Sequence, residues 1–96
     1  MSVPTNRNPI MTPILDFTMS ATMLILFETR FSDPDGDPLT FSFTSSDESI
    51  LTVTESESFP GHLQLTKIGT GVVLVSITAS DGKGGTAINR FTVTVD

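Results

Sequence analysis

Apolar and polar residues alternate in short runs along most of the chain. Alternation at every second residue is typical of β-strands that bury one face and expose the other. The clearest runs cover residues 72–80 and 87–95. Their inward positions carry apolar side chains: Val73, Val75, Ile77, Ala79, Phe91, Val93 and Val95. No window keeps a helical period over three turns, so the pattern predicts an all-β chain.

Further runs predict strands that are shorter or less regular. Residues 39–45 alternate cleanly, and residues 22–31 are predicted to form one long strand. The inward positions of these two runs are apolar: Leu39, Phe41, Phe43, Met23, Ile25, Phe27 and Phe31. Residues 50–54 and 63–68 predict short strands, and residues 11–19 a broken first strand. Because turn signals separate these roughly seven strands, we expect an antiparallel, Ig-like or cadherin-like β-sandwich.

Four large apolar side chains fall outside this core pattern. Leu24 and Leu26 occupy the outward positions of their strand. Phe17 and Phe59 are the phenylalanines that lack core parity and could be exposed. One interpretation is local cover by an edge loop or by the first strand. The other is a contact patch for a neighbouring module, which makes these four residues a candidate interface.

A chain of 96 residues is expected to form one domain with one modest core. Residues 1–8 are predicted to be a linker, and residues 9–96 the sandwich domain. The start lacks a basic region followed by an apolar run, so we expect a fragment whose parent carries its leader elsewhere. The longest apolar run, Met23–Phe27, is far short of a membrane span, and no membrane insertion by this fragment is expected.

Composition narrows the classes of function. The net charge is −6, and the five basic residues are scattered singly, so no stripe is available to follow the phosphates of a nucleic acid. Cysteine is absent, which excludes disulfides and thiolate metal sites. His62 is the single histidine, and we expect it in a solvated turn. No catalytic motif is present, so an enzyme is not expected.

Two stretches rich in aspartate resemble a known family. Residues 31–41, Phe-Ser-Asp-Pro-Asp-Gly-Asp-Pro-Leu-Thr-Phe, and residues 77–86, Ile-Thr-Ala-Ser-Asp-Gly-Lys-Gly-Gly-Thr, are similar to loops of cadherin-like (dystroglycan-type) Ig modules. Such modules occur in tandem in bacterial surface and secreted proteins, with calcium between consecutive modules. The resemblance covers most of residues 9–96. The cadherin Leu-Asp-Arg-Glu segment and the glutamate of the first strand are missing.

The resemblance implies a set of calcium ligands at the N-terminal pole of the module. Asp33 and Asp35 correspond to the Asp-x-Asp of one loop, and Asp81 corresponds to the aspartate of the other. Asn6 and Asn8 resemble, more weakly, the asparagines of the linker before a module. Since the family's remaining ligands come from the preceding module, the resemblance implies only part of a site in this chain.

The chemistry of the aspartates points in the same direction, with one alternative. Asp33, Asp35 and Asp37 alternate along a tight loop, so their carboxylates can converge and either repel one another or recruit a cation. Calcium prefers six to eight oxygen ligands, and carboxylates supply them. The alternative is that these residues only build a turn, which Asp and Gly favour by themselves.

These observations favour a non-catalytic extracellular or cell-surface repeat module for adhesion or spacing. Its expected partners are neighbouring modules of the same chain, and beyond these another surface protein or a polysaccharide. The alternative function is a carbohydrate-binding accessory module of a secreted polysaccharide-degrading enzyme. Sugar-binding faces generally use aromatic platforms, and the chain has no Trp and no Tyr. A passive spacer without a ligand is the third possibility.

Overall fold

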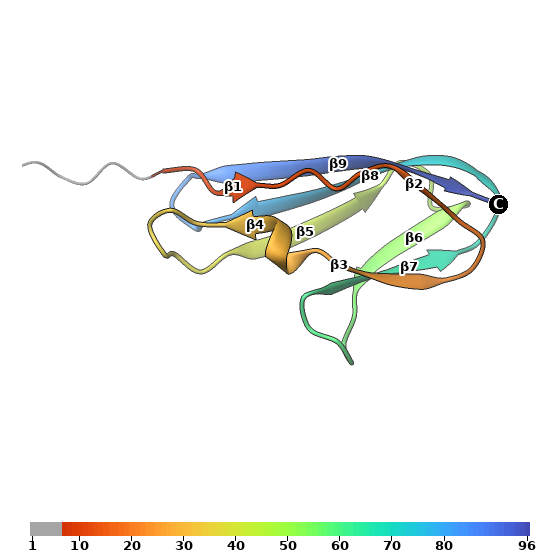
Figure 1. The fold of residues 1–96 in the computed structure, drawn as a ribbon, viewed down its shortest axis with the longest axis horizontal. Helices are drawn as coiled ribbons and strands as arrows, with labels where there is room; N and C mark the ends of the chain where they lie inside the picture. The colour runs from red at the N-terminus through yellow and green to blue at the C-terminus, as the bar shows by residue number, and fades with distance from the viewer. Residues whose placement is uncertain (1–6) are drawn as a thin grey trace, which may run out of the picture.

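The computed structural model describes residues 7–96, which form an all-β fold (Figure 1). It contains nine strands and one short 3₁₀ helix. In chain order these are β1 (Ile10–Met11), β2 (Phe17–Met19), β3 (Met23–Leu26), η1 (Glu28–Arg30), β4 (Phe31–Ser32), β5 (Thr40–Ser45), β6 (Leu51–Glu55), β7 (His62–Lys67), β8 (Gly71–Ser80) and β9 (Thr86–Val95).

Two sheets form the sandwich. One has four strands in the order β2-β9-β8-β5, and the other has three in the order β3-β7-β6. A two-stranded pair, β1-β4, lies at the end where the described chain begins (Figure 1). The inward side chains of both sheets make one core, whose buried members are Met19, Phe27, Phe31, Leu51, Leu63, Leu65, Val73, Val75, Ile77, Ala79, Phe91, Val93 and Val95.

Most of the strands predicted from the alternating pattern are confirmed. The expected break in residues 11–19 separates β1 from β2, and Pro13 lies in the gap because it cannot donate to a ladder. The turn between β8 and β9 is a glycine-rich hairpin. Gly82 and Gly84 both have positive φ there, a conformation that side chains with a Cβ disfavour.

The prediction of one continuous strand over residues 22–31 is wrong. The chain turns after β3 at Phe27, whose backbone is in the right-handed helical region, and η1 follows. The N–H groups of Phe27 and Glu28 both donate to the carbonyl of Gly61. In a continuous strand Thr29 would face the core between Phe27 and Phe31. The 3₁₀ turn places Thr29 in solvent while both phenylalanines stay buried.

The sandwich departs from the expected antiparallel pairing at one edge. β2 pairs with β9 in parallel, with Phe17 opposite Val93 and Met19 opposite Val95. The segment before β2 continues along β9 through Asn89, which is fully buried although polar. Its side-chain Oδ1 accepts from the N–H of Ile14 at 3.0 Å, and its Nδ2 donates to the carbonyl of Thr12 at 2.8 Å. Asn89 thus replaces ladder bonds around Pro13.

His62 is not in a solvated turn, contrary to the prediction. It begins β7, where it pairs with Leu26, and it is half-buried. Its ring lies edge-on to Phe59, with ring centroids 6.0 Å apart.

In the described part of the chain, no helix is long and apolar enough to cross a membrane.

Candidate metal site

The loop between β4 and β5 brings the first aspartates together. Residues 33–36 form a tight turn in which the N–H of Gly36 donates to the carbonyl of Asp33 at 3.0 Å. Asp, Pro and Gly at the first, second and fourth positions suit a type I turn. The carboxylate of Asp33 also accepts from the N–H of Asp35 at 2.8 Å, as an Asx turn does. The local sequence therefore fixes the path of this loop.

Asp33, Asp35 and Asp37 converge as the alternation along the loop predicted. Each offers one carboxylate oxygen, and these oxygens lie within 4.8 Å of one another. Among residues 7–96, Oδ2 of Asp33 and Oδ2 of Asp37 are buried and have no hydrogen-bond partner. A buried acceptor without a partner loses its hydration and gains nothing in return. A cation that accepts these oxygens as ligands would remove that penalty.

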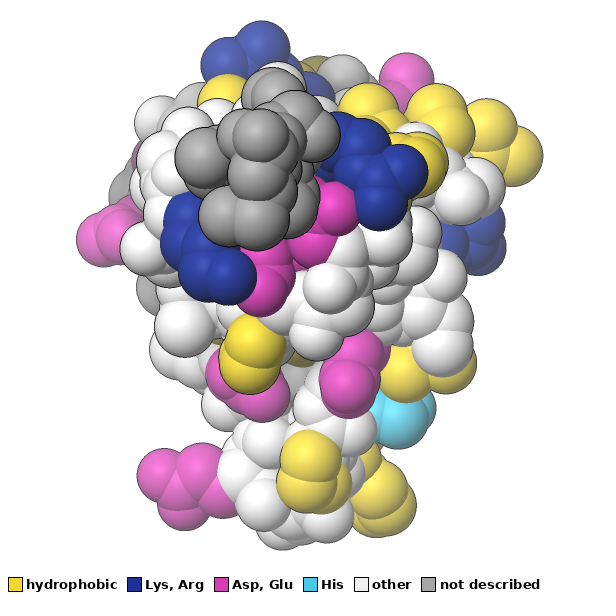
Figure 2. All heavy atoms as spheres, turned by 90° about the vertical axis from the view of Figure 1, so that its left-hand side faces the viewer, with side chains coloured by type: hydrophobic (Ala, Val, Ile, Leu, Met, Phe, Trp, Pro, Cys, Tyr) yellow, Lys and Arg dark blue, Asp and Glu magenta, His cyan; other side chains and the backbone are white. Residues whose placement is uncertain are grey.

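Two basic side chains neutralise part of this charge. Nε and Nη2 of Arg7 donate to Oδ1 of Asp35 at 2.9 and 2.8 Å, and its backbone N–H donates to Oδ2 at 2.8 Å. Nζ of Lys83 lies 2.6 Å from Oδ1 of Asp37. Figure 2 shows acidic and basic side chains side by side on this pole of the molecule. A metal ion at this cluster must compete with both cations.

The same contacts shift two proton equilibria. Hydrogen bonds from the backbone and then the side chain of Arg7 lower the pKa of Asp35. The hydrogen bond and charge of Asp37 raise the pKa of Lys83, and the charges of Asp81 and Asp33 add to the effect. Asp35 and Lys83 are therefore in their charged forms at neutral pH. Four carboxylates share two cations here, so the pole keeps an excess of negative charge.

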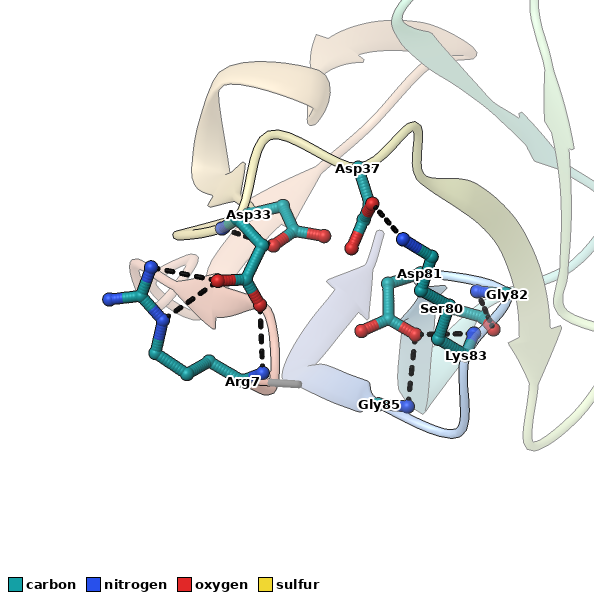
Figure 3. Close-up of polar contacts among 9 residues, drawn as sticks. Arg7, Asp33, Asp37, Ser80, Asp81, Gly82, Lys83 and Gly85 are labelled. Atoms are coloured by element: carbon teal, nitrogen blue, oxygen red, sulfur yellow. Dashed lines mark hydrogen bonds and ion pairs between the residues drawn. The ribbon is translucent and has the colours of Figure 1, made fainter. Parts of the chain in front are cut away.

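Asp81 lies in the β8–β9 turn at the same pole, beside Lys83 (Figure 3). Its side chain is buried, and its Oδ1 accepts from the N–H groups of Lys83 at 2.8 Å and Gly85 at 2.9 Å. It is not among the carboxylates that lie within 4.8 Å of one another. In this structure Asp81 shapes the turn that carries Lys83 toward Asp37.

The predicted linker residues contribute unequally. Asn6 lies outside the described residues. Asn8 is exposed and directly precedes Pro9 and β1. Arg7, which the sequence pattern did not single out, holds Asp35 by its backbone and its side chain. Lys83 was also missed. Its place in the turn after Asp81 was the available signal, because that turn was expected at the pole of the Asp33–Asp37 loop.

The candidate interface residues do not form one surface. Phe59 is 55% exposed and Leu24 is 37% exposed. These two line a shallow groove of about 280 Å³ together with Thr22, Met23, Ser56, Ser58 and Gln64. Leu26 and Phe17 line a different groove, between the edges of the two sheets. Phe17 is only partly exposed, and its ring stacks on Phe91 with centroids 5.9 Å apart.

Fold and sequence together define the class of this protein as an immunoglobulin-like module. A family model described as bacterial Ig domain matches residues 6–94. The chain belongs to this family. The match supports the Ig-like part of the resemblance inferred from the loops, while the narrower cadherin-like type stays a prediction. No curated protein matches the chain.

Solved structures share the fold at low sequence identity. One is a nucleoside hydrolase-related protein from Saccharophagus degradans that is associated with carbohydrate metabolism. It has a TM-score of 0.70 and 19% identity, over 95% of this chain and 26% of that one. Another is an endo-fucoidan hydrolase of glycoside hydrolase family 107, with a TM-score of 0.61 and 19% identity, over 99% of this chain and 17% of that one. The present chain therefore spans about a quarter or less of these proteins.

Proposed function

We propose that the chain is a non-catalytic, extracellular or cell-surface adhesion or spacer module that binds calcium at the pole of the Asp33–Asp37 loop. The observation that carries the proposal is the pair of buried, unpartnered oxygens on Asp33 and Asp37 within a group of three carboxylates. Membership in the bacterial Ig domain family supports an extracellular repeat module. Calcium binding goes beyond this family assignment and rests on the geometry of the three carboxylates.

Calcium suits the donor set better than softer metals do. Every donor is a carboxylate oxygen, and calcium takes six to eight oxygens in a flexible geometry. Asp33, Asp35 and Asp37 supply only part of such a shell. Water and the module that precedes this one would supply the rest, so the isolated module should bind with a Kd of about 1 mM. An ion shared by two modules would restrict the hinge between them.

Calcium is expected to stabilise the chain in a thermal melt. At about ten times a millimolar Kd, linkage predicts roughly 1.4 kcal/mol of stabilisation. For a domain of this size, this is a rise in Tm of roughly 5–10 °C. The melt should be followed by far-UV circular dichroism in calcium and in EDTA. Magnesium at the same concentration is the ionic control, because it demands a stricter octahedral geometry.

Variants separate metal binding from a general effect of salt. Asp33→Asn with Asp37→Asn should keep the fold, since it relieves repulsion, and should abolish the calcium response. Asp47→Asn is the matched control, because Asp47 lies in the turn after β5 and accepts from Ser49. Arg7→Gln with Lys83→Gln should enlarge the response, because two competing cations are removed. If this last variant also ignores calcium, the chain holds no calcium site.

A second candidate function is binding of a polysaccharide at the groove beside Phe59. The specific observation is an exposed aromatic ring with polar neighbours, which is the composition of a sugar platform. The structural neighbours named for carbohydrate metabolism and fucoidan hydrolysis give it a context. Retention on insoluble or gel-embedded polysaccharides should then weaken at least about tenfold in Phe59→Ala, as expected for a lost stacking contact plus its buried area. Unchanged retention, or none by the parent chain, would remove this candidate.

A further inference from the structure

The two ends of the described chain leave the sandwich at opposite poles. Arg7 lies at the pole of the Asp33–Asp37 loop, where it holds Asp35. Asp96 lies at the other pole, where its N–H donates to the carbonyl of Met19 and its own carbonyl accepts from Nζ of Lys67 (Figure 1). Tension applied through neighbouring modules would therefore pull along the length of the strands.

The first and last segments of the fold are bonded to each other along that direction. β2 and β9 run parallel and pair over three positions. The bonds continue beyond β2, because Oδ1 of Asp16 accepts from the N–H of Thr92 at 2.8 Å. Asn89 extends them further, through its bonds to Thr12 and Ile14. Side chains thus lengthen a short ladder over residues 12–19.

Because β2 and β9 are parallel, pulling at the two ends of the chain loads all the hydrogen bonds of this ladder together. When the two ends are pulled apart, residues 12–19 move one way along the strand axis and β9 moves the other way. The hydrogen bonds run across the strands, so all of them are loaded in shear at the same time. In an antiparallel pair held at one end, the bonds would instead open one after another. Simultaneous loading raises the barrier to unfolding under force, which governs survival under tension.

We propose that residues 12–19 and β9 form a shear clamp that makes this module resist tension between its two ends. The clamp deepens the proposed role as a spacer, because it rests on neighbours that pull at both poles. It does not depend on calcium. Its essential parts are the parallel β2–β9 pair and the side-chain bonds of Asp16 and Asn89.

Single-molecule force spectroscopy in EDTA tests the clamp without any contribution from metal binding. The chain has no cysteine, so one introduced thiol gives a unique point of attachment. In the first geometry the handles are at the two termini. In the second they are at Thr70→Cys and the C-terminus, which lie together because Gly71 pairs with Val95. The unfolding force in the first geometry should be about twofold or more above the force in the second geometry, which unzips β8 from β9.

A matched pair of variants identifies the residues that bear the load. Asp16→Ala removes an exposed acceptor inside the clamp and should lower the end-to-end unfolding force. Asp47→Ala removes an acceptor of the same kind from the turn after β5 and should leave that force unchanged. Equal forces in the two pulling geometries would overturn the clamp, and so would an Asp16→Ala variant as strong as the parent chain. If the clamp resists force in a chain whose stability does not respond to calcium, only the proposed calcium site is refuted.

Discussion

Phe27→Ala is expected to lower the free energy of unfolding by about 3–5 kcal/mol. The side chain is fully buried, and its ring makes edge-to-face contacts with Phe41 at 4.9 Å and Phe43 at 5.1 Å between centroids. Each such pair adds roughly 0.5–1.5 kcal/mol beyond the buried area. Phe27 also joins β3 to η1, where its N–H donates to Gly61. Its removal leaves a cavity between the two sheets that neither can readily close.

The loss should be measured by chemical denaturation with far-UV circular dichroism, since the chain has no Trp or Tyr to report by fluorescence. Phe59→Ala is the control, because it makes the same chemical change at a side chain that is 55% exposed. A domain of this length has a total stability of roughly 5–15 kcal/mol, so Phe27→Ala should leave little of it. A loss no larger than that of Phe59→Ala would contradict this view of the core.

Local pattern was sufficient to predict most of the fold. The alternation in residues 72–80 and 87–95 follows from the two-residue period of a strand, and the observed β8 and β9 are buried on the predicted parity. Turn chemistry predicted the loop after β4, because Asp33, Pro34 and Gly36 prefer their positions whatever surrounds them. These features are set by residues that are close together in the sequence, so one sequence alone is enough to predict them.

Pairing between distant segments could not be predicted in the same way. Arg7 is bound to Asp35 across 28 residues, and Lys83 is bound to Asp37 across 46 residues. In neither pair does the sequence around one residue indicate its partner. The convergence of Asp33, Asp35 and Asp37 was predictable because it is local. The distance of Asp81 from that group, and the hydrogen bonds that occupy its Oδ1, depended on the path of the β8–β9 turn.

Two polar residues at inward positions did carry a signal. Thr29 has the parity of Phe27 and Phe31, and Asn89 has the parity of Phe91 and Val93. A regular strand would bury both, which is unfavourable unless their polar atoms are bonded. The fold resolves the conflict in two ways: the chain turns Thr29 out to solvent, and it gives Asn89 two backbone partners. Each of these polar residues at an inward position marks a place where regular strand pairing ends.

Asn89→Ala is expected to lower the free energy of unfolding by about 2–3 kcal/mol, because it leaves the N–H of Ile14 and the carbonyl of Thr12 without their partner. The amide of Ile14 should also exchange with solvent faster by roughly one to two orders of magnitude, as the free energy of local opening falls. Denaturant melts measure the first effect, and hydrogen exchange followed by NMR measures the second. Asn8→Ala is the control, since Asn8 is exposed.

Asn89→Leu separates hydrogen bonding from packing. Leucine has the branched shape and the number of side-chain heavy atoms of asparagine, is larger, and has no polar atoms, so it should fill the site and still lose both bonds. We expect it to be destabilised about as much as Asn89→Ala, and recovery of the parent stability would show that the site needs only volume. The reason lies in Pro13, which interrupts the ladder between Thr12 and Ile14. A side-chain amide carries the same donor and acceptor as a peptide group, so Asn89 can bond both sides of that interruption.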